Sequence, residues 1–303
     1  MAEQTIQIDG INYYTLYEQP PDTASKSSPA PCVLLIHALG ANHTMYDSIV
    51  PALHAAGYAT LRYDHIGHNN TPCPAKSTST ISDTSSSSHR RVSQGGKLVY
   101  HADDLTTHAH HLVRARTGQS WVKAVVGCSI GGVLALRYGM LFLEDVDCIL
   151  SVAAPGLTSP ADKRQLWSDR IKILEEDNTT GRHELAEQTA ARWFPGEGPD
   201  FDAVRAKAFE QLKTCSLGGY CYLADAIRWY DFEADLQAGK LSGTKCLIAG
   251  GSADGAISLS ELERIAGLIN GAEFVKFEGV GHLPPMQNVE EFKALMLKFF
   301  GGA

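Results

Sequence analysis

The pentapeptide Gly127-Cys128-Ser129-Ile130-Gly131 separates an apolar run, residues 121–126, from a helix-like run, residues 133–143. Such a segment predicts a strand, a sharp turn and a helix, with the central serine in a strained backbone conformation. Both glycines are required because a Cβ atom at either position would clash within so tight a turn. The serine hydroxyl is then exposed beyond the end of the strand. The segment therefore predicts a nucleophilic serine at the edge of a sheet.

Apolar runs and helix-like segments alternate along most of the chain. Near the N-terminus, two short β-like runs joined at Asp9-Gly10 predict a hairpin. Further apolar runs predict strands, most of them buried on both faces, at residues 32–36, 58–63, 121–126, 147–152, 246–249 and 273–277. This alternation indicates an α/β fold with a mostly parallel sheet flanked by helices.

The pattern changes between residues 157 and 240, where strand-like runs stop and helical spacing takes over. Three of the four tryptophans fall in this segment: Trp167, Trp193 and Trp229. We therefore expect a helical cap over 157–240, inserted into a core formed by 1–156 and 241–303. Within the core, residues 71–97 are rich in serine and predict a surface loop.

Composition narrows the classes of partner. The 303 residues are 44% hydrophobic and 20% charged, as expected of a globular protein, and the net charge is −8. No run of Lys and Arg exceeds two, which argues against nucleic acid and membrane surfaces and favours a small-molecule substrate. The seven cysteines form no C-x-x-C pair, as expected of cysteines that stay reduced. The N-terminal residues lack the pattern of a signal peptide. We therefore expect a cytoplasmic protein.

A serine hydroxyl is a poor nucleophile unless an imidazole accepts its proton and a carboxylate orients that imidazole. Asp254 stands four residues after the apolar run 246–250, and His282 follows the strand-like run that ends at Phe277. Each stands where a loop leaves the carboxyl end of a strand, and the order serine, acid, histidine suits this kind of turn. Alone, Asp254 also fits a charge near a helix N-terminus, and His282 a loop histidine. Their joint placement predicts a triad of Ser129, Asp254 and His282.

Attack of a serine on a carbonyl creates an oxyanion, which backbone N–H groups must stabilise. One predicted donor is Ile130, directly after the nucleophile and at the positive end of its helix. The other is Leu39, in the turn after the strand 32–36. We expect the neighbouring His37 to hold this turn rather than to act as a base.

Other side chains offer competing chemistry. Cys128 precedes the serine in the turn, and its side chain is expected to point away from the site and pack in the core. Asp64 follows a strand and is interpreted as a turn-capping carboxylate. One helical face has the spacing of a metal site and carries His101, Asp104, His108 and His111. That face also borders Leu105 and Leu112, so polar packing is favoured and neither a metal nor a cofactor is expected.

Several motifs together resemble those of the α/β-hydrolase superfamily: His37-Ala38-Leu39-Gly40, Asp64-His65-Ile66-Gly67-His68, residues 127–131, Asp254 and Gly281-His282. The cap segments Ala191-Arg192-Trp193-Phe194, Gly218-Gly219-Tyr220 and Ala224-Asp225-Ala226-Ile227 are similar to those of the 3-oxoadipate enol-lactonase subgroup. The resemblance implies an α/β-hydrolase fold with an inserted cap and a cofactor-free enzyme that opens a small acidic lactone. It also implies that Trp193 lies over the substrate, although packing within the cap explains this tryptophan equally well. The family's usual G-H-G-x-S stretch is here Gly67-His68-Asn69-Asn70-Thr71.

The leading hypothesis is a serine hydrolase of a lactone or small carboxylic ester that acts through an acyl-enzyme. The same residues also suit a hydrolase that cleaves a carbon–carbon bond in a diketone-type substrate, because the cap selects the substrate. A protein that senses a ligand in the same pocket, with little turnover, is a further alternative.

Overall fold

The computed structural model describes residues 2–21, 29–74, 100–159 and 161–301. From residue 75 onward, the predicted serine-rich loop 71–97 lies outside the described residues.

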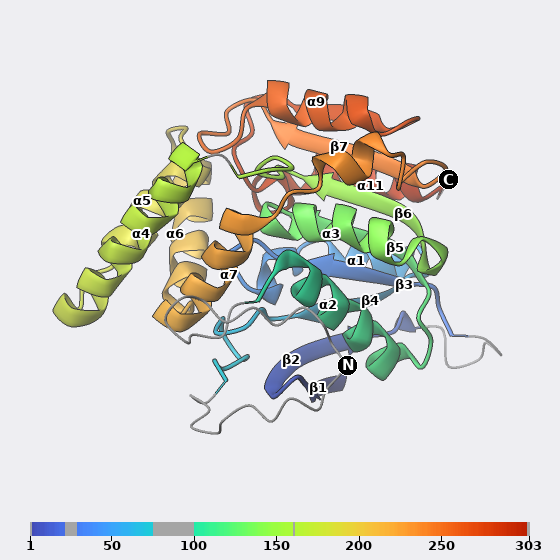
Figure 1. Ribbon diagram of the computed structural model, residues 1–303, viewed down its shortest axis with the longest axis horizontal. Coiled ribbons are helices and arrows are strands. Elements are labelled where there is room, and N and C mark those ends of the chain that lie inside the picture. The colour runs from blue at the N-terminus through green and yellow to red at the C-terminus, as the bar shows by residue number, and fades with distance from the viewer. Residues whose placement is uncertain (1, 22–28, 75–99, 160, 302–303) are drawn as a thin grey trace.

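Within those residues, one sheet of eight strands forms the centre of the molecule, in the order β1-β2-β4-β3-β5-β6-β7-β8 (Figure 1). The first two strands are the predicted antiparallel hairpin, and β2 also pairs antiparallel with β4. All other neighbours are parallel, which confirms the predicted mostly parallel α/β sheet. The strands are β1 (Ala2–Ile8), β2 (Ile11–Glu18), β3 (Cys32–Ile36), β4 (Ala59–Tyr63), β5 (Val122–Cys128), β6 (Val146–Val152), β7 (Lys245–Gly251) and β8 (Glu273–Phe277).

Helices cover both faces of the sheet, as the doubly buried strands require. In β3, Leu34 and Ile36 pack toward one face, while Val33 and Leu35 pack toward the other, because side chains alternate along a strand. One face is covered by α2 (Ala102–Thr117), α3 (Ile130–Leu141) and α9 (Leu259–Leu268). The opposite face is covered by α1 (Val50–Ala55) and α11 (Val289–Phe300). Short helices occur at η2 (His43–Tyr46), η3 (Leu143–Asp145) and α10 (Pro284–Gln287).

The chain between β6 and β7 forms five described helices and no named strand. They are α4 (Ala161–Thr180), α5 (Glu184–Trp193), α6 (Pro199–Lys213), α7 (Leu217–Trp229) and α8 (Glu233–Gln237). In Figure 1, α4 to α7 lie beside the ends toward which the arrows of β6 and β7 point. The division into core and cap at residues 157 and 240 stays a prediction. We call the segment α4–α8 the insertion.

The direction in which successive parallel strands are added to the sheet reverses at β3: β4 lies on one side of it and β5 on the other. Strand β3 pairs with β4 on one side and β5 on the other, and Ile36 at its end lies opposite Gly127. The loops that leave β3 and β5 therefore diverge to opposite faces and leave a crevice, the usual ligand site of open α/β sheets. No described helix is both long and apolar enough to cross a lipid bilayer.

Candidate active site

Ser129 occupies the turn between the end of β5 and the start of α3. Its backbone has φ +59° and ψ −121°, a conformation that non-glycine residues rarely adopt. The turn is tight: a Cβ atom on Gly127 would lie 1.8 Å from the carbonyl oxygen of Gly131. A Cβ atom on Gly131 would lie 2.2 Å from the carbonyl oxygen of Ile36. Both glycines are therefore required by close backbone approach.

Asp254 and His282 lie on the loops that follow β7 and β8, and the fold brings them into direct contact. The imidazole Nδ1–H donates to the Asp254 Oδ2 atom over 2.7 Å. The second carboxylate oxygen accepts the backbone N–H groups of Ala256 at 2.7 Å and Ile257 at 3.1 Å. Burial raises the pKa of Asp254, but the charge and hydrogen bond of His282 and the two N–H donors outweigh it and lower the pKa overall. The carboxylate is therefore ionised and fixes the imidazole tautomer.

Ser129 and His282 line one cavity of about 350 Å³, together with Leu39 and Trp193. The ring of Trp193 stacks on that of His282, with 5.9 Å between ring centroids and 27° between planes. Because the Nδ1 side of the imidazole faces Asp254, its Nε2 atom is the one left for chemistry in the cavity.

The two predicted oxyanion donors lie on the loops at the crevice. Leu39 lines the cavity, and Ile130 is the first residue of α3, whose first turn contains no acidic side chain. No acceptor among the described residues pairs with the N–H of either residue. Both groups are thus free to meet a ligand.

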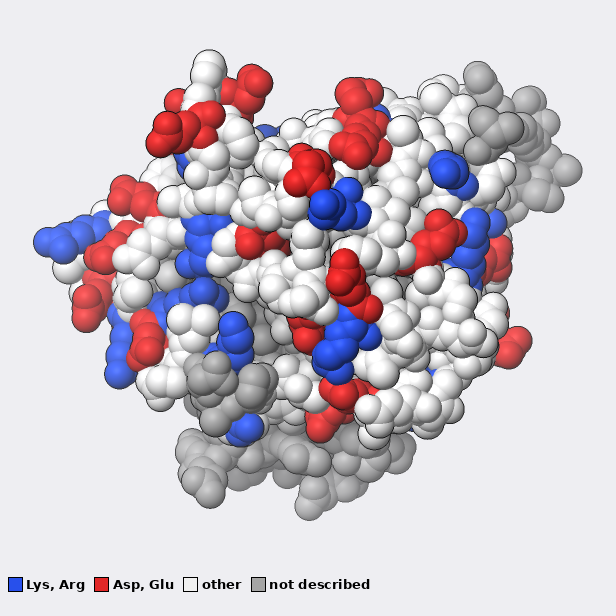
Figure 2. All heavy atoms as spheres, turned by 90° about the horizontal axis from the view of Figure 1, so that it is seen from above, with Lys and Arg blue, Asp and Glu red and all other residues white. Residues whose placement is uncertain are grey.

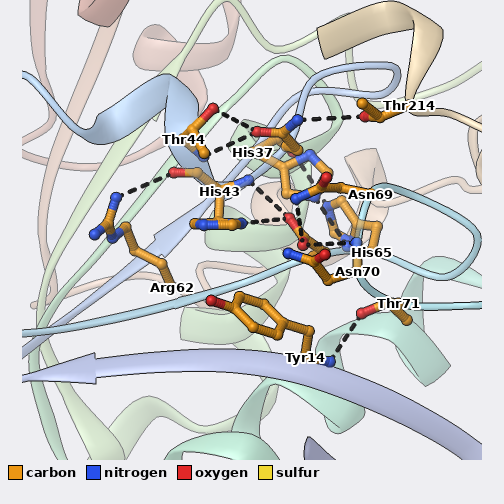
Figure 3. Close-up of polar contacts among 12 residues, drawn as sticks. Tyr14, His37, His43, Thr44, Arg62, His65, Asn69, Asn70, Thr71 and Thr214 are labelled. Carbon is orange, nitrogen blue, oxygen red and sulfur yellow. Dashed lines mark hydrogen bonds and ion pairs between the residues drawn. The ribbon is translucent and has the colours of Figure 1, made fainter. Parts of the chain in front are cut away.

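The turn that contains Leu39 is held by three buried histidines, two of which are labelled in Figure 3. The His65 N–H donates to His37 Nε2 over 2.9 Å, and the Gly40 N–H donates to His68 Nε2 over 3.0 Å. Burial lowers the pKa of His65 to about 3 and of His68 to about 4, and lowers that of His37 well below its ordinary value. The three rings are therefore neutral, and His37 holds the turn as predicted.

Asp64 directly follows β4 and anchors the same region. Its Oδ1 atom accepts the backbone N–H of His43 at 2.9 Å and the His43 ring nitrogen at 2.8 Å. Its Oδ2 atom accepts Asn69 Nδ2 at 3.0 Å and the Asn70 N–H at 3.2 Å. This side chain is the predicted turn-capping carboxylate.

Comparison with known proteins identifies the family. The sequence model described as the alpha/beta hydrolase family matches residues 33–295, which is most of the chain. The chain belongs to the alpha/beta hydrolase family. The predicted superfamily and fold are thereby confirmed. No curated protein gave a significant sequence match.

Solved structures share the fold over nearly their whole length. A hydrolase from Pseudomonas aeruginosa PA01 has a TM-score of 0.77 at 19% identity, covering 99% of this chain and 98% of that one. An enol-lactonase from Burkholderia xenovorans LB400 has a TM-score of 0.76 at 18% identity, covering 98% and 99%. An esterase from Exiguobacterium antarcticum has a TM-score of 0.77 at 17% identity, covering 99% and 100%. At such identities the likeness establishes the fold of this hydrolase.

None of the competing groups lines the cavity. Cys128 is fully buried, and burial raises the pKa of its thiol well above the ordinary value. On α2, His108 contacts the Tyr13 hydroxyl and Asp9, while Asp104 accepts the N–H of His101. Across the described residues, no group of three or more His, Cys, Asp or Glu side chains converges as metal ligands would.

The basic wall of the cavity in this hydrolase was not predicted from the sequence. Arg170 on α4 and Arg192 at the end of α5 line the cavity beside Tyr220 on α7. Arg192 and Tyr220 belong to the segments that resemble the enol-lactonase subgroup, but no pattern in the sequence indicates that they line a cavity. The position of Arg170 in the cavity wall could not be predicted, because only helix packing decides which face of α4 lines the cavity.

Proposed function

We propose that this hydrolase cleaves a lactone or small carboxylic ester with Ser129 as nucleophile, His282 as general base and Asp254 as orienting acid. The observation that carries the proposal is the Asp254–His282 hydrogen bond of 2.7 Å at a cavity whose wall includes both His282 and Ser129. The strained backbone of Ser129 supports it further, because strain of this kind concentrates at functional sites.

In the proposed reaction, His282 Nε2 takes the hydroxyl proton as Ser129 Oγ attacks the substrate carbonyl. The negative charge that forms on the carbonyl oxygen is met by the N–H groups of Leu39 and Ile130. The imidazolium then protonates the leaving oxygen, and an acyl group remains on Ser129. His282 next takes a proton from water as it attacks the acyl carbon, and it returns this proton to Ser129 Oγ when the acid is released. In a lactone the leaving oxygen stays on the product.

The substrate class is inferred from the cavity. Its volume of about 350 Å³ suits a small molecule. Trp193 is the proposed substrate contact, because its ring borders both the cavity and the face of His282. The structural neighbours include an enol-lactonase and an esterase, which supports a lactone or carboxylic ester as the substrate.

The test is a panel of lactones, 4-nitrophenyl esters and β-diketones, assayed with wild type and with Ser129→Ala. We expect ester or lactone hydrolysis by wild type and a loss of at least about 10³-fold in Ser129→Ala. A fluorophosphonate should label the wild type within the peptide 127–131. Wild-type rates in Ser129→Ala would refute the nucleophile. Turnover of β-diketones alone would favour carbon–carbon cleavage, and tight binding without turnover of any class would favour a sensor.

A further inference from the structure

The insertion packs directly onto the turn that carries one of the proposed oxyanion donors. We call this turn, residues 37–41, the oxyanion turn. Gly40 follows Leu39 and has φ +82°, a conformation that favours glycine. Leu212, near the end of α6, is buried against it: a Cβ atom on Gly40 would lie 2.6 Å from the Leu212 Cδ2 atom. A side chain of the insertion therefore supports the residue next to the donor.

Two hydrogen bonds fix the peptide groups on either side of Leu39. In the peptide group before it, the carbonyl oxygen of Ala38 accepts the His37 Nδ1–H over 2.8 Å. In the peptide group after it, the N–H of Gly40 donates to His68 Nε2 over 3.0 Å. Because each peptide group is planar, these two bonds determine the direction in which the Leu39 N–H points.

The ring of His68 is held in turn by a thiol of the insertion. Its Nδ1–H donates to the carbonyl oxygen of Ile66 over 2.9 Å, so Nε2 carries no proton and acts as an acceptor. The Cys215 Sγ atom lies 3.2 Å from this Nε2 atom, closer than to the carbonyl oxygen of Ser216 at 3.6 Å. Burial lowers the pKa of His68 to about 4 and raises the pKa of Cys215. The thiol therefore keeps its proton and donates it to the neutral ring.

The backbone fixes this contact as well. His68 and Cys215 form an isolated antiparallel bridge between the core and the insertion, which places their side chains opposite each other. Beside this bridge, the N–H of Asn69 donates to the carbonyl oxygen of Thr214 over 3.0 Å. The segment 211–216 is thus held in place against both the oxyanion turn and the loop of His68.

The groups that meet in this contact are uncharged: a leucine side chain, a thiol, neutral imidazole rings and backbone amides. The Lys and Arg side chains of the insertion gather instead at its surface, on the left part of the face shown in Figure 2. The contact therefore acts through packing and hydrogen-bond geometry rather than through charge.

The direction of an oxyanion donor matters, because loss of one donor costs about 10²- to 10³-fold in kcat. We propose that Leu212 and Cys215 of the insertion are positioning residues for the Leu39 N–H. Leu212 acts through Gly40, and Cys215 acts through His68. The insertion then helps to stabilise the oxyanion besides lining the cavity. This inference rests on the proposed function and deepens it.

The test compares 4-nitrophenyl acetate with its thiono analogue, in which sulfur replaces the carbonyl oxygen. Sulfur is a weak hydrogen-bond acceptor, so the thiono ester gains little from the oxyanion donors. The readout is the ratio of kcat/KM for the oxygen ester over the thiono ester. We expect Leu212→Ala and Cys215→Ala each to lower this ratio by about 10-fold, a part of the loss caused by removing a whole donor. A merely structural defect lowers both rates and leaves the ratio unchanged.

The matched controls remove the same kinds of side chain elsewhere. Leu236→Ala truncates a buried leucine on α8 of the insertion, and Cys246→Ala removes a buried thiol from β7. Neither residue lines the cavity, and both variants should keep the wild-type ratio. Leu212→Met fills a similar volume and should keep the ratio within about threefold. A constant ratio in both Leu212→Ala and Cys215→Ala would overturn the inference, as would an equal fall in Leu236→Ala.

Amide hydrogen exchange separates this inference from the proposed function. The exchange rate of the Gly40 N–H, measured by NMR in Ser129→Ala, reports on the oxyanion turn without catalysis. We expect this exchange to be about 10-fold faster when Leu212→Ala or Cys215→Ala is added. Faster exchange supports the positioning even if ester hydrolysis does not depend on Ser129. Equal exchange of Gly40 with and without these substitutions refutes the positioning alone.

Discussion

The backbone N–H of His282 donates a hydrogen bond to the carbonyl oxygen of Trp193, with 2.8 Å between the two atoms. The first residue carries the proposed base, and the second is the last residue of helix α5 in the insertion. Their rings also stack at the cavity wall. The insertion is therefore attached to the loop that positions the imidazole, so that its placement and the chemistry are linked.

This attachment predicts the effect of Gly281→Ala. A Cβ atom at Gly281 would lie 2.0 Å from the carbonyl oxygen of Trp193, so either the His282 loop or the end of α5 must move. Because a shift of about 1 Å at a reacting group costs about 10²-fold in rate, we expect kcat/KM to fall by about that factor. Gly267→Ala on α9 is the control, since nothing beyond its chain neighbours and its own helix backbone lies within 4 Å of the added methyl group. Unchanged kcat/KM in Gly281→Ala would contradict the link.

Asp254→Asn tests the orienting carboxylate. The amide retains the shape of the side chain but no longer stabilises the imidazolium, and it favours the wrong tautomer of His282. We expect kcat to fall by about 10⁴-fold, while circular dichroism shows a folded protein. A fall of less than tenfold would show that Asp254 does not serve His282 in this way.

Cys128→Ala tests the alternative nucleophile. The thiol is fully buried, its raised pKa keeps it protonated, and its Sγ atom lies 3.7 Å from the carbonyl oxygen of His282. We expect kcat/KM within about fivefold of wild type and a loss of about 1 kcal/mol in the free energy of unfolding. Complete loss of fluorophosphonate labelling in Cys128→Ala, with Ser129 unchanged, would be incompatible with this assignment.

The buried histidines predict loss of stability in mild acid. Burial lowers the pKa of His65 to about 3 and of His68 to about 4 from an ordinary value of 6.5. In the window below pH 6.5 the unfolded chain binds protons that the folded protein does not. The free energy of unfolding therefore falls as pH decreases, by about 2 kcal/mol for each such histidine between pH 7 and pH 5.

Urea unfolding of wild type and of His68→Gln at pH 7 and pH 5 checks this dependence. The glutamine side chain offers an acceptor for the Gly40 N–H but does not titrate, so the loss between the two pH values should be smaller by about 2 kcal/mol. An identical pH dependence in the two proteins would show that His68 is not neutral in the folded state.

Much of the fold was predictable, because the strands of a doubly covered sheet are continuous apolar runs. The run 32–36 became β3 with every residue buried, and the less apolar run 273–277 became the edge strand β8, in which Glu273 and Lys276 are exposed. Between β3 and β4, η2 and the short α1 form two separate helices, with a break between residues 46 and 50. Local spacing does not show where a helix changes type.

The residues of the candidate site were also predictable only in part. Ser129, Asp254 and His282 were predicted because each follows a strand, and the carboxyl ends of parallel strands meet at one edge. The arginines of the cavity wall were not predicted, because a charged residue on a helix has the same local pattern whether it faces solvent or a cavity.

The sequence by itself determined the alternation of strands and helices, the glycines of the serine turn and the chain order of the proposed catalytic residues. These features depend on neighbours within a few positions along the chain, where backbone sterics and hydrophobic periodicity act. The tertiary structure alone decided the 2.7 Å contact between Asp254 and His282, the stacking of Trp193 on His282 and the placement of Arg170 and Arg192 in one cavity wall. These relationships join residues far apart in sequence, and they exist only once packing of the sheet and the insertion has fixed which side chains share a cavity.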